Sequence, residues 1–195
     1  MVLAGGRGLR MGGIDKGWIE LAGRPLIAHV LARFAPQVGE VLISANRNIE
    51  RYASLGYTVI TDDVPGDFSG PLAGLRAALS HARVDLVCSV PCDSPMLPVD
   101  LVARLREALQ ATGAQLAVAR TSDRIHPVFA LYRRELRSTL DAYLAAGERT
   151  VQAWQKRQRS VEVSFDDVPR AFENINTPAD LERLQRGPGG SLQMP

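Results

Sequence analysis

The first seventeen residues combine glycine with fixed positive charge, the two features of a phosphate-binding loop. Six glycines follow a short apolar run here, together with Arg7, Arg10 and Lys16. Glycine lets the backbone approach a ligand closely and permits positive φ, so successive N–H groups can point into one concavity. The stretch therefore predicts a cradle for a polyphosphate. A flexible, solvated basic loop is the alternative, because short motifs also arise by chance.

The glycine spacing differs from that of the two commonest phosphate loops. The pattern G-x-x-x-x-G-K-[ST] is absent, and G-x-G-x-x-G fails because Met11 lies where the third glycine should be. We expect Lys16 and Arg10 to neutralise phosphate charge, the first as a compact point charge and the second as a planar fork. For Arg7 we expect a role in solubility, and for Asp15 the orientation of its neighbour Lys16.

Asp93 is the second candidate for chemistry. It follows the apolar run Leu86–Val90, with a proline two residues before it. A carboxylate at the end of a buried strand suits Mg²⁺, which takes one or two carboxylates plus phosphate oxygens. The alternatives are an N-cap for the helix expected near Pro98 and a hydrated loop aspartate. Phosphates, a divalent ion and fixed cations together are the usual components of phosphoryl or nucleotidyl transfer.

These residues need a fold that brings them together, and strand and helix patterns alternate along the chain. Short apolar runs predict strands at 41–43, 57–60, 86–90, 115–119, 128–132 and 161–165. One-sided apolar stripes predict helices at 26–34, 49–55, from Pro71 onward, and at 98–111, 135–146, 150–158 and 178–186. The alternation predicts an α/β fold of three layers with a mostly parallel central sheet. Residues 64–71 are expected to form a surface loop and residues 120–126 a polar connection.

Ligands of such sheets gather beyond the carboxyl ends of the strands. Four polar clusters follow predicted strands, namely the glycine loop, Ser44–Asn46, Asp62–Asp63 and Asp93. They are far apart in the sequence, but we expect them to converge on one edge of the sheet. His126, before Pro127, has two open interpretations, contact with a substrate or a place at a strand edge, and His29 is expected to be structural.

Composition limits the classes of function that need to be considered. The chain of 195 residues is 46% hydrophobic and 23% charged with a net charge of +2, so no nucleic-acid or membrane partner is expected. We expect one domain over 1–186 and a disordered tail over 187–195. Cys88 and Cys92, without a signal peptide before them, favour core thiols in a reducing cytoplasm. The first strand has only Met1–Leu3 available, so either it is short or the native start lies upstream.

Several of these motifs together resemble the molybdenum cofactor guanylyltransferase family of the nucleotidyltransferase superfamily. The resemblance covers residue 2 to about residue 185 and rests on Leu3–Gly6, Arg10–Gly12, Asp15–Lys16, Gly70–Gly74, Pro91–Asp93 and Asn174–Pro178. It implies a Rossmann-like nucleotidyltransferase fold and transfer of GMP from GTP to the terminal phosphate of molybdenum-bound molybdopterin, with release of pyrophosphate. It also implies Mg²⁺ as cofactor, with Mn²⁺ as a substitute, and cofactor-insertion proteins and apo-molybdoenzymes as further partners.

The resemblance assigns roles to individual residues of this chain. Its catalytic residues would be Arg10, Lys16 and Asp93, with Asp93 also the metal ligand. The nucleotide would be bound by Leu3, Ala4, Gly5, Gly6, Lys16, Ser44, Asn46, Asp62 and Asp93. Asn174 and Asn176 would lie towards the pterin substrate. Ser44 departs from the pattern, since some family members have an asparagine there and serine reaches less far.

Two other functions remain open from the sequence. The chain could transfer a different nucleotide, such as CMP from CTP, to molybdopterin or to a sugar phosphate. It could also be a non-catalytic carrier that hands the cofactor to an apo-enzyme, although Lys16 and Asp93 together favour catalysis. No Ser/His/Asp arrangement and no G-x-S-x-G motif is present, so no covalent hydrolase intermediate is expected.

Overall fold

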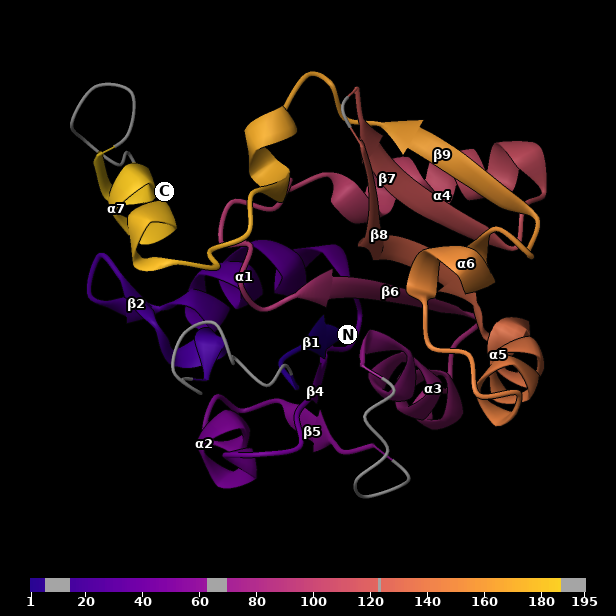
Figure 1. Ribbon diagram of the computed structural model, residues 1–195, viewed down its shortest axis with the longest axis horizontal. Coiled ribbons are helices and arrows are strands. Elements are labelled where there is room, and N and C mark those ends of the chain that lie inside the picture. Colours follow the sequence, from indigo (N-terminus) through magenta and orange to yellow (C-terminus); the bar gives the residue numbers. More distant parts are fainter. Residues whose placement is uncertain (6–14, 63–69, 123, 187–195) are drawn as a thin grey trace.

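The computed structural model describes residues 1–5, 15–62, 70–122 and 124–186. Within these residues the centre of the molecule is a seven-stranded sheet with the strand order β5-β4-β1-β6-β8-β7-β9 (Figure 1). Its strands are β1 (Val2–Leu3), β4 (Leu42–Ser44), β5 (Thr58–Ile60), β6 (Leu86–Pro91), β7 (Leu116–Thr121), β8 (Arg124–Arg133) and β9 (Ser160–Ser164). A separate antiparallel hairpin consists of β2 (Glu20–Leu21) and β3 (Arg24–Pro25).

The sheet is mostly parallel, as predicted. Strands β5, β4, β1 and β6 all run in one direction, and β9 runs parallel to β7. Strand β8 lies antiparallel to both of its neighbours, β6 and β7. The carboxyl ends of β1, β4, β5 and β6 therefore meet at the same edge of the sheet, where the sequence predicts its polar clusters.

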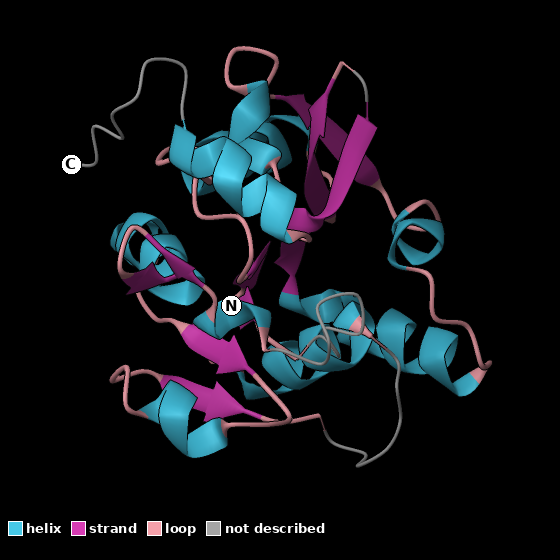
Figure 2. Ribbon diagram, turned by 60° about the vertical axis from the view of Figure 1, so that its left-hand side comes forward, coloured by secondary structure: helices cyan, strands magenta, loops and turns pink. Residues whose placement is uncertain are grey.

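Helices cover both faces of this sheet, which confirms the three-layer α/β fold (Figure 2). The helices are α1 (Leu26–Phe34), α2 (Ile49–Ala53), α3 (Pro71–His81), α4 (Leu101–Thr112), α5 (Arg137–Ala145), α6 (Val151–Gln155) and α7 (Pro178–Arg186). One core cluster joins the sheet to α1, α2 and α4, and the other joins it to α3, α5 and α6. Successive residues of a strand point to opposite faces of the sheet and so belong to different clusters. In β7, Ala117 belongs to the first cluster and Val118 to the second.

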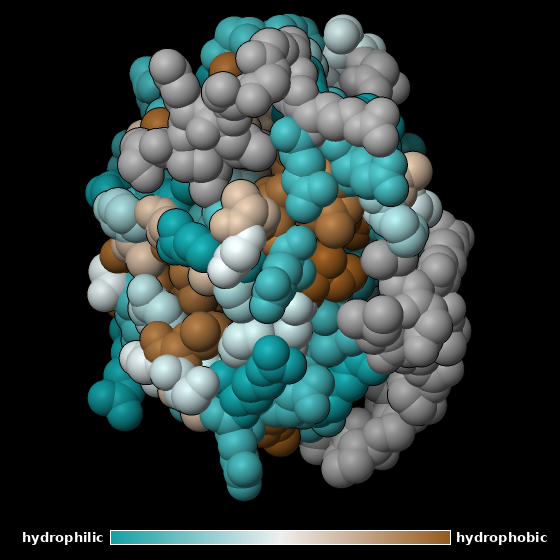
Figure 3. Space-filling view, turned by 90° about the vertical axis from the view of Figure 1, so that its left-hand side faces the viewer, coloured by the Kyte–Doolittle hydropathy of each residue, from teal (hydrophilic) through white to brown (hydrophobic). Residues whose placement is uncertain are grey.

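Helix α7 packs outside these two layers, against the β2–β3 hairpin and the start of α1. A third small cluster contains Leu21, Leu26 and Ile175, with Leu181 and Leu184 of α7 packed against it. The face of the molecule that carries α7 shows apolar side chains among polar ones (Figure 3). The C-terminal helix is thus held beside the N-terminal third of the chain.

Some element boundaries differ from the predictions. Helix α4 begins at Leu101 rather than at Pro98, with Asp100 as its N-cap. The expected polar connection over 120–126 is mostly strand, because β7 continues to Thr121 and pairs directly with β8 from Arg124. Backbone pairing does not require apolar side chains, so a polar hairpin end leaves a weak signal in the sequence. Residues 64–69 of the loop expected over 64–71 lie outside the described residues, as do Asp63 and Asp123.

Two structural expectations about side chains are confirmed. Cys88 and Cys92 are buried free thiols, and burial raises the pKa of Cys88 to about 12. His29 is buried with its Nε2 at 2.8 Å from the carbonyl oxygen of Leu21. Within the described residues, no helix is long and apolar enough to cross a membrane.

Helix α3 approaches the sheet closely at Gly74. A Cβ added there would collide with Ser44 Oγ and lie 2.9 Å from Leu3 Cδ2. The absence of a side chain therefore sets the distance between α3 and the carboxyl ends of β1 and β4.

We predict that Gly74→Ala lowers the free energy of unfolding by about 1–3 kcal/mol, the usual cost of overpacking a core. Gly39→Ala is the matched control, because a Cβ at that exposed position meets nothing within 4 Å. Urea unfolding of both variants measures the difference. Equal stability of the two variants would mean that the contact between α3 and the sheet is loose.

Candidate active site

The backbone at the end of β1 is bound to both neighbouring strands. The amide of Ala4 donates to the carbonyl oxygen of Ser44 at 2.8 Å, and the amide of Cys92 donates to that of Leu3 at 3.0 Å. The Ala4 amide is therefore committed to the sheet, and Gly5 is the first exposed residue after the strand. Two predicted residues of the loop, Gly6 and Arg10, lie outside the described residues.

Asn46 and Asp62, which we call the rim pair, lie beside Gly5 at the same edge. Asn46 Nδ2 donates to Asp62 Oδ2 at 2.6 Å, and the amide of Asp62 donates to Asn46 Oδ1 at 2.9 Å. A Cβ at Gly5 would lie 3.5 Å from Asn46 Nδ2. The structure thus brings these three sequence-predicted residues together. Ser44 does not join them, because its side chain is buried against Gly74 of α3.

Lys16 and Asp93 form an ion pair between the end of β6 and the turn Lys16–Trp18. Lys16 Nζ lies 3.0 Å from Asp93 Oδ2, and it also donates to Asn176 Oδ1 at 2.5 Å. The lysine side chain is 22% exposed and therefore only partly buried. Residues separated by 77 and 160 positions in the sequence therefore meet at one cationic group.

The C-terminal segment is bound to the residues that follow β6. The amide of Ile175 donates to the carbonyl oxygen of Asp93 at 2.9 Å, and Ser94 Oγ donates to Asn174 Oδ1 at 2.8 Å. These contacts hold Asn174 and Asn176 next to Asp93. The sequence predicted both asparagines for the site, and the structure brings both of them to it.

Asp93 is the candidate metal ligand of this edge. It is only 7% exposed, and its Oδ1 is buried without a hydrogen-bond partner among the described residues. A buried carboxylate oxygen without a partner is costly, so a cation there would be stabilising. The described residues contain no group of three or more His, Cys, Asp or Glu side chains able to hold a metal. This donor set fits Mg²⁺ or Mn²⁺, which would take its other ligands from phosphates and water.

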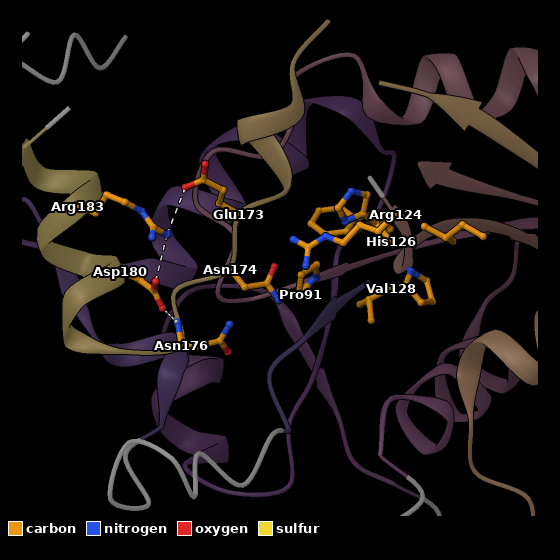
Figure 4. Close-up of a pocket in the computed structure, with 12 residues that line it drawn as sticks. Pro91, Arg124, His126, Val128, Glu173, Asn174, Asn176, Asp180 and Arg183 are labelled. Atoms are coloured by element: carbon orange, nitrogen blue, oxygen red, sulfur yellow. Dashed lines mark hydrogen bonds and ion pairs between the residues drawn. The ribbon is translucent and has the colours of Figure 1, made fainter. Parts of the chain in front are cut away.

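A pocket of about 310 Å³ is lined in part by Asn174 and Asn176 (Figure 4), and Asn176 connects it to Lys16. Its wall comes from the end of β6 and from β8 on one side, and from the segment 173–183 on the other. The lining residues are Pro91, Arg124, Ile125, His126, Pro127, Val128, Phe129, Glu173, Asn174, Asn176, Asp180 and Arg183. Amide groups, both signs of charge and flat apolar surface are therefore available to one ligand.

His126 belongs to the wall of this pocket. Its ring stacks on Phe172 with centroids 4.6 Å apart, and its Nε2 lies 2.9 Å from Thr121 Oγ1. The sequence left two interpretations of His126 open, a place at a strand edge and contact with a substrate. The structure places His126 in strand β8 and in the lining of the pocket, which is compatible with both. Sequence reasoning missed Arg124, Asp180 and Arg183 as pocket residues, and their only signal was their polarity near predicted strand and helix ends.

Asp180 fixes the backbone at the entrance to α7. Its Oδ2 accepts hydrogen bonds from Thr177 Oγ1 at 2.9 Å and from the amides of Thr177 and Asn176 at 2.9 and 3.1 Å. The bond from the Thr177 side chain is the main reason why the pKa of the Asp180 carboxyl lies below its ordinary value. Asp180 therefore orients the residue that contacts Lys16.

We predict that Asp180→Asn lowers the free energy of unfolding by about 1 kcal/mol at neutral pH, as expected for a weakened helix cap. Because the folded pKa is lowered, the carboxylate stabilises the fold above its unfolded pKa of about 3.9, and this stabilisation is lost as the pH falls through the folded pKa. Thermal unfolding of both proteins between neutral and acidic pH measures this. The difference between them should shrink in acid, and a constant difference would exclude the role of the charge.

The fold and this edge define a class of protein, and comparison with known families identifies it. Residues 1–161 match the family model of the MobA-like NTP transferase domain. The chain belongs to this family and is a nucleotidyltransferase.

Relatives within the family share one name. A molybdenum cofactor guanylyltransferase from Shewanella sp. (strain MR-4) is 48% identical over 184 residues, which are 94% of this chain and 93% of that protein. A protein of the same name from Burkholderia orbicola (strain MC0-3) is 53% identical over 95% of this chain and 94% of its own length. The resemblance stated from the motifs is thereby confirmed.

Solved structures agree with the fold. The molybdopterin-guanine dinucleotide biosynthesis protein A from Archaeoglobus fulgidus superimposes with a TM-score of 0.77 at 26% identity, covering 93% of this chain and 94% of that one. The 2-C-methyl-D-erythritol 4-phosphate cytidylyltransferase from Thermus thermophilus has a TM-score of 0.68 at 20% identity, covering 93% and 94% of the two chains. At that identity the second likeness supports the fold alone.

Proposed function

We propose that the protein transfers GMP from GTP to the terminal phosphate of molybdenum-bound molybdopterin and releases pyrophosphate. The observation that carries this proposal is the position of Lys16 Nζ, which contacts both Asp93 and the pocket residue Asn176. One cation can therefore lie between a triphosphate at the end of β1 and an acceptor in the pocket. The name shared by the relatives supports the choice of substrates.

In this proposal the nucleotide occupies the edge formed by the ends of β1, β4 and β5. The rim pair would contact the nucleoside. Leu3, Ala4 and Gly5, at the end of β1, would also contact the nucleotide. Lys16 would bind the phosphates, together with the proposed ligands Gly6 and Arg10. Ser44 would support this edge from within the core, since its hydroxyl group is covered by α3.

The pocket is the proposed site of the acceptor. Its volume of about 310 Å³ lies within the range of small-molecule sites. Asn174 and Asn176 offer amide donors and acceptors that match the hydrogen-bonding edge of a pterin ring. Arg124 would supply positive charge for an anionic ligand, because guanidinium groups bind phosphate through paired hydrogen bonds. Arg183 is instead paired with Asp180 at 3.1 Å and with Glu173 at 3.7 Å. The stacked rings of His126 and Phe172 give one wall a flat surface.

Asp93 is the proposed ligand of Mg²⁺, or of Mn²⁺ as a substitute, through its Oδ1 atom. The bound ion would neutralise phosphate charge. Asp93 Oδ2 would remain paired with Lys16, so that the carboxylate orients the ammonium group.

The reaction needs alignment and charge neutralisation rather than a base. The attacking group is a phosphate monoester whose second pKa is about 6, so it is largely ionised at neutral pH. One of its oxygens forms a bond to the α-phosphorus, and the bond from that phosphorus to the pyrophosphate oxygen breaks. Lys16 reduces the repulsion between the two anions, and the two binding sites hold them for in-line attack. No residue of the chain forms a covalent intermediate in this mechanism.

We predict that Lys16→Ala and Asp93→Ala each reduce kcat/KM for GTP by about 10²-fold or more, the usual effect of losing one preorganised charge contact. Pyrophosphate release with GTP, molybdopterin and Mg²⁺ measures this, and EDTA should abolish it. Lys156→Ala is the matched control for the lysine, because that residue is exposed at the end of α6. Wild-type rates from Lys16→Ala or Asp93→Ala would show that the reaction occurs elsewhere.

A panel of GTP, CTP, ATP and UTP tests the choice of nucleotide. We predict preferential turnover of GTP, with no labelled enzyme after incubation with GTP carrying a labelled α-phosphate. Preference for CTP would favour the alternative cytidylyl transfer, and a labelled adduct would contradict direct attack. Tight GTP binding without any metal-dependent product would favour a non-catalytic carrier.

We also propose that residues 1–186 act as one domain in the cytoplasm and deliver the product to insertion proteins and apo-molybdoenzymes.

A further inference from the structure

Asp15, the residue before Lys16, is buried, and its carboxylate accepts several hydrogen bonds. Its Oδ1 accepts a hydrogen bond from the Tyr52 hydroxyl group at 2.6 Å and one from the amide of Gly17 at 3.3 Å. Its Oδ2 accepts one from Asn48 Nδ2 at 2.8 Å, and Arg47 Nε lies 3.9 Å away. At 9% exposure, this carboxylate is the N-cap of the turn that carries Lys16. The sequence predicts that Asp15 orients its neighbour Lys16. None of these contacts is made to the Lys16 side chain, so any such effect acts through the backbone of the turn.

The side-chain partners of Asp15 all come from one short segment, 47–52. That segment begins directly after Asn46, a member of the rim pair. Lys16 meanwhile contacts Asp93 and Asn176. Two adjacent residues, Asp15 and Lys16, therefore connect the β4 side of the edge with the β6 side.

The surroundings of Asp15 leave it little freedom to move. Tyr52 is fully buried and packs on Trp18 with ring centroids 5.2 Å apart. A Cβ at Gly17 would lie 2.5 Å from the Tyr52 hydroxyl oxygen, so glycine is needed for this approach. Asn48 has φ of 52° and ψ of 33°, a left-handed conformation that its bond to Asp15 stabilises. Burial raises the pKa of Tyr52 above its ordinary value, and its hydroxyl group therefore stays protonated as a donor.

We infer that Asp15 is a positioning residue that fixes Lys16 relative to the rim pair. The two ends of one nucleotide, the nucleoside and the triphosphate, must be bound at a set separation for in-line attack. Asp15 holds that separation by bonding the turn of Lys16 to the segment that follows Asn46. This inference rests on the proposed function, since it takes Lys16 as the phosphate ligand and the rim pair as the nucleoside contact.

A double-mutant cycle in kcat/KM tests whether Asp15 acts through Lys16. Asp15→Asn should reduce kcat/KM for GTP by about 10-fold in the wild-type background but by less than about 2-fold in Lys16→Ala, because residues that act as a unit are not additive. A purely structural role would give the same loss in both backgrounds and would overturn the inference. Tyr52→Phe, which removes one hydroxyl group, is measured in the same cycle and decides the outcome if Asp15→Asn does not fold.

A reciprocal exchange tests the contact itself. Asp15→Asn turns an amide towards Asn48, and adding Asn48→Asp restores one donor and one acceptor with the total charge unchanged. The double variant should recover kcat/KM to within about 3-fold of wild type, since contacting residues couple strongly. Failure to recover, with unfolding temperatures matching the wild type, would contradict the assignment.

Two controls separate this inference from the proposed function. Tyr143→Phe removes a comparable tyrosine hydroxyl group, bonded to the carbonyl oxygen of Thr150 at 3.0 Å, and should leave kcat/KM unchanged. If the wild-type protein releases no pyrophosphate with GTP, molybdopterin and Mg²⁺, the proposed function fails, and if Lys16→Ala has wild-type activity, the reaction occurs elsewhere in the protein. If Lys16→Ala is impaired while Asp15→Asn and Tyr52→Phe are not, only the positioning role fails.

Discussion

The site depends on one cationic group with two polar partners. Lys16 Nζ lies 3.0 Å from a carboxylate that is only 7% exposed, and it also binds an amide oxygen from the far end of the chain. Removing a carboxylate from water is costly unless a counter-charge or hydrogen bonds compensate for it. Lys16 compensates one oxygen of Asp93, and the other oxygen is left for a cation. This asymmetry makes the ion pair a candidate for function rather than a structural feature only.

The fold places the parts of this arrangement. Strand β1 lies between β4 and β6, so the residues after these strands meet although they are far apart in sequence. The chain then returns through residues 174–176, which bind the residues after β6 before α7 packs on the β2–β3 hairpin. Lys16 and Asp93 at this edge therefore adjoin the pocket through Asn176, which lines the pocket and contacts Lys16. Two anions that repel each other in water would meet across a fixed positive charge there.

Sequence reasoning predicted the parts that local pattern determines. Strand β6 is apolar except for Ser89, and α7 begins at a proline that follows a threonine, so the sequence predicts both to within a residue or two. Lys16 and Asp93 could be singled out because glycines surround one and a buried strand precedes the other. Polar residues that follow parallel strands are expected to meet at the carboxyl ends of those strands, and Lys16 and Asp93 do lie together there.

Other parts depend on tertiary contacts that leave little trace in the sequence. The bonds from Asp15 to Asn48 and Tyr52 span 33 and 37 residues, and only the packing of α2 reveals them. Ser44 is the last residue of β4, and the absence of a side chain at Gly74 lets α3 cover it. The polar end of the β7–β8 hairpin has no apolar run, so the sequence predicts a connection where the backbone pairs as strand.

A crystal structure with a non-hydrolysable GTP analogue and Mn²⁺, whose anomalous signal locates the ion, tests the central claim most directly. The account predicts the ion beside Asp93 Oδ1, the triphosphate within hydrogen-bonding distance of Lys16 Nζ, and the nucleoside beside Asn46 and Asp62. A triphosphate bound away from the end of β1, with Asp93 free of metal, would contradict it.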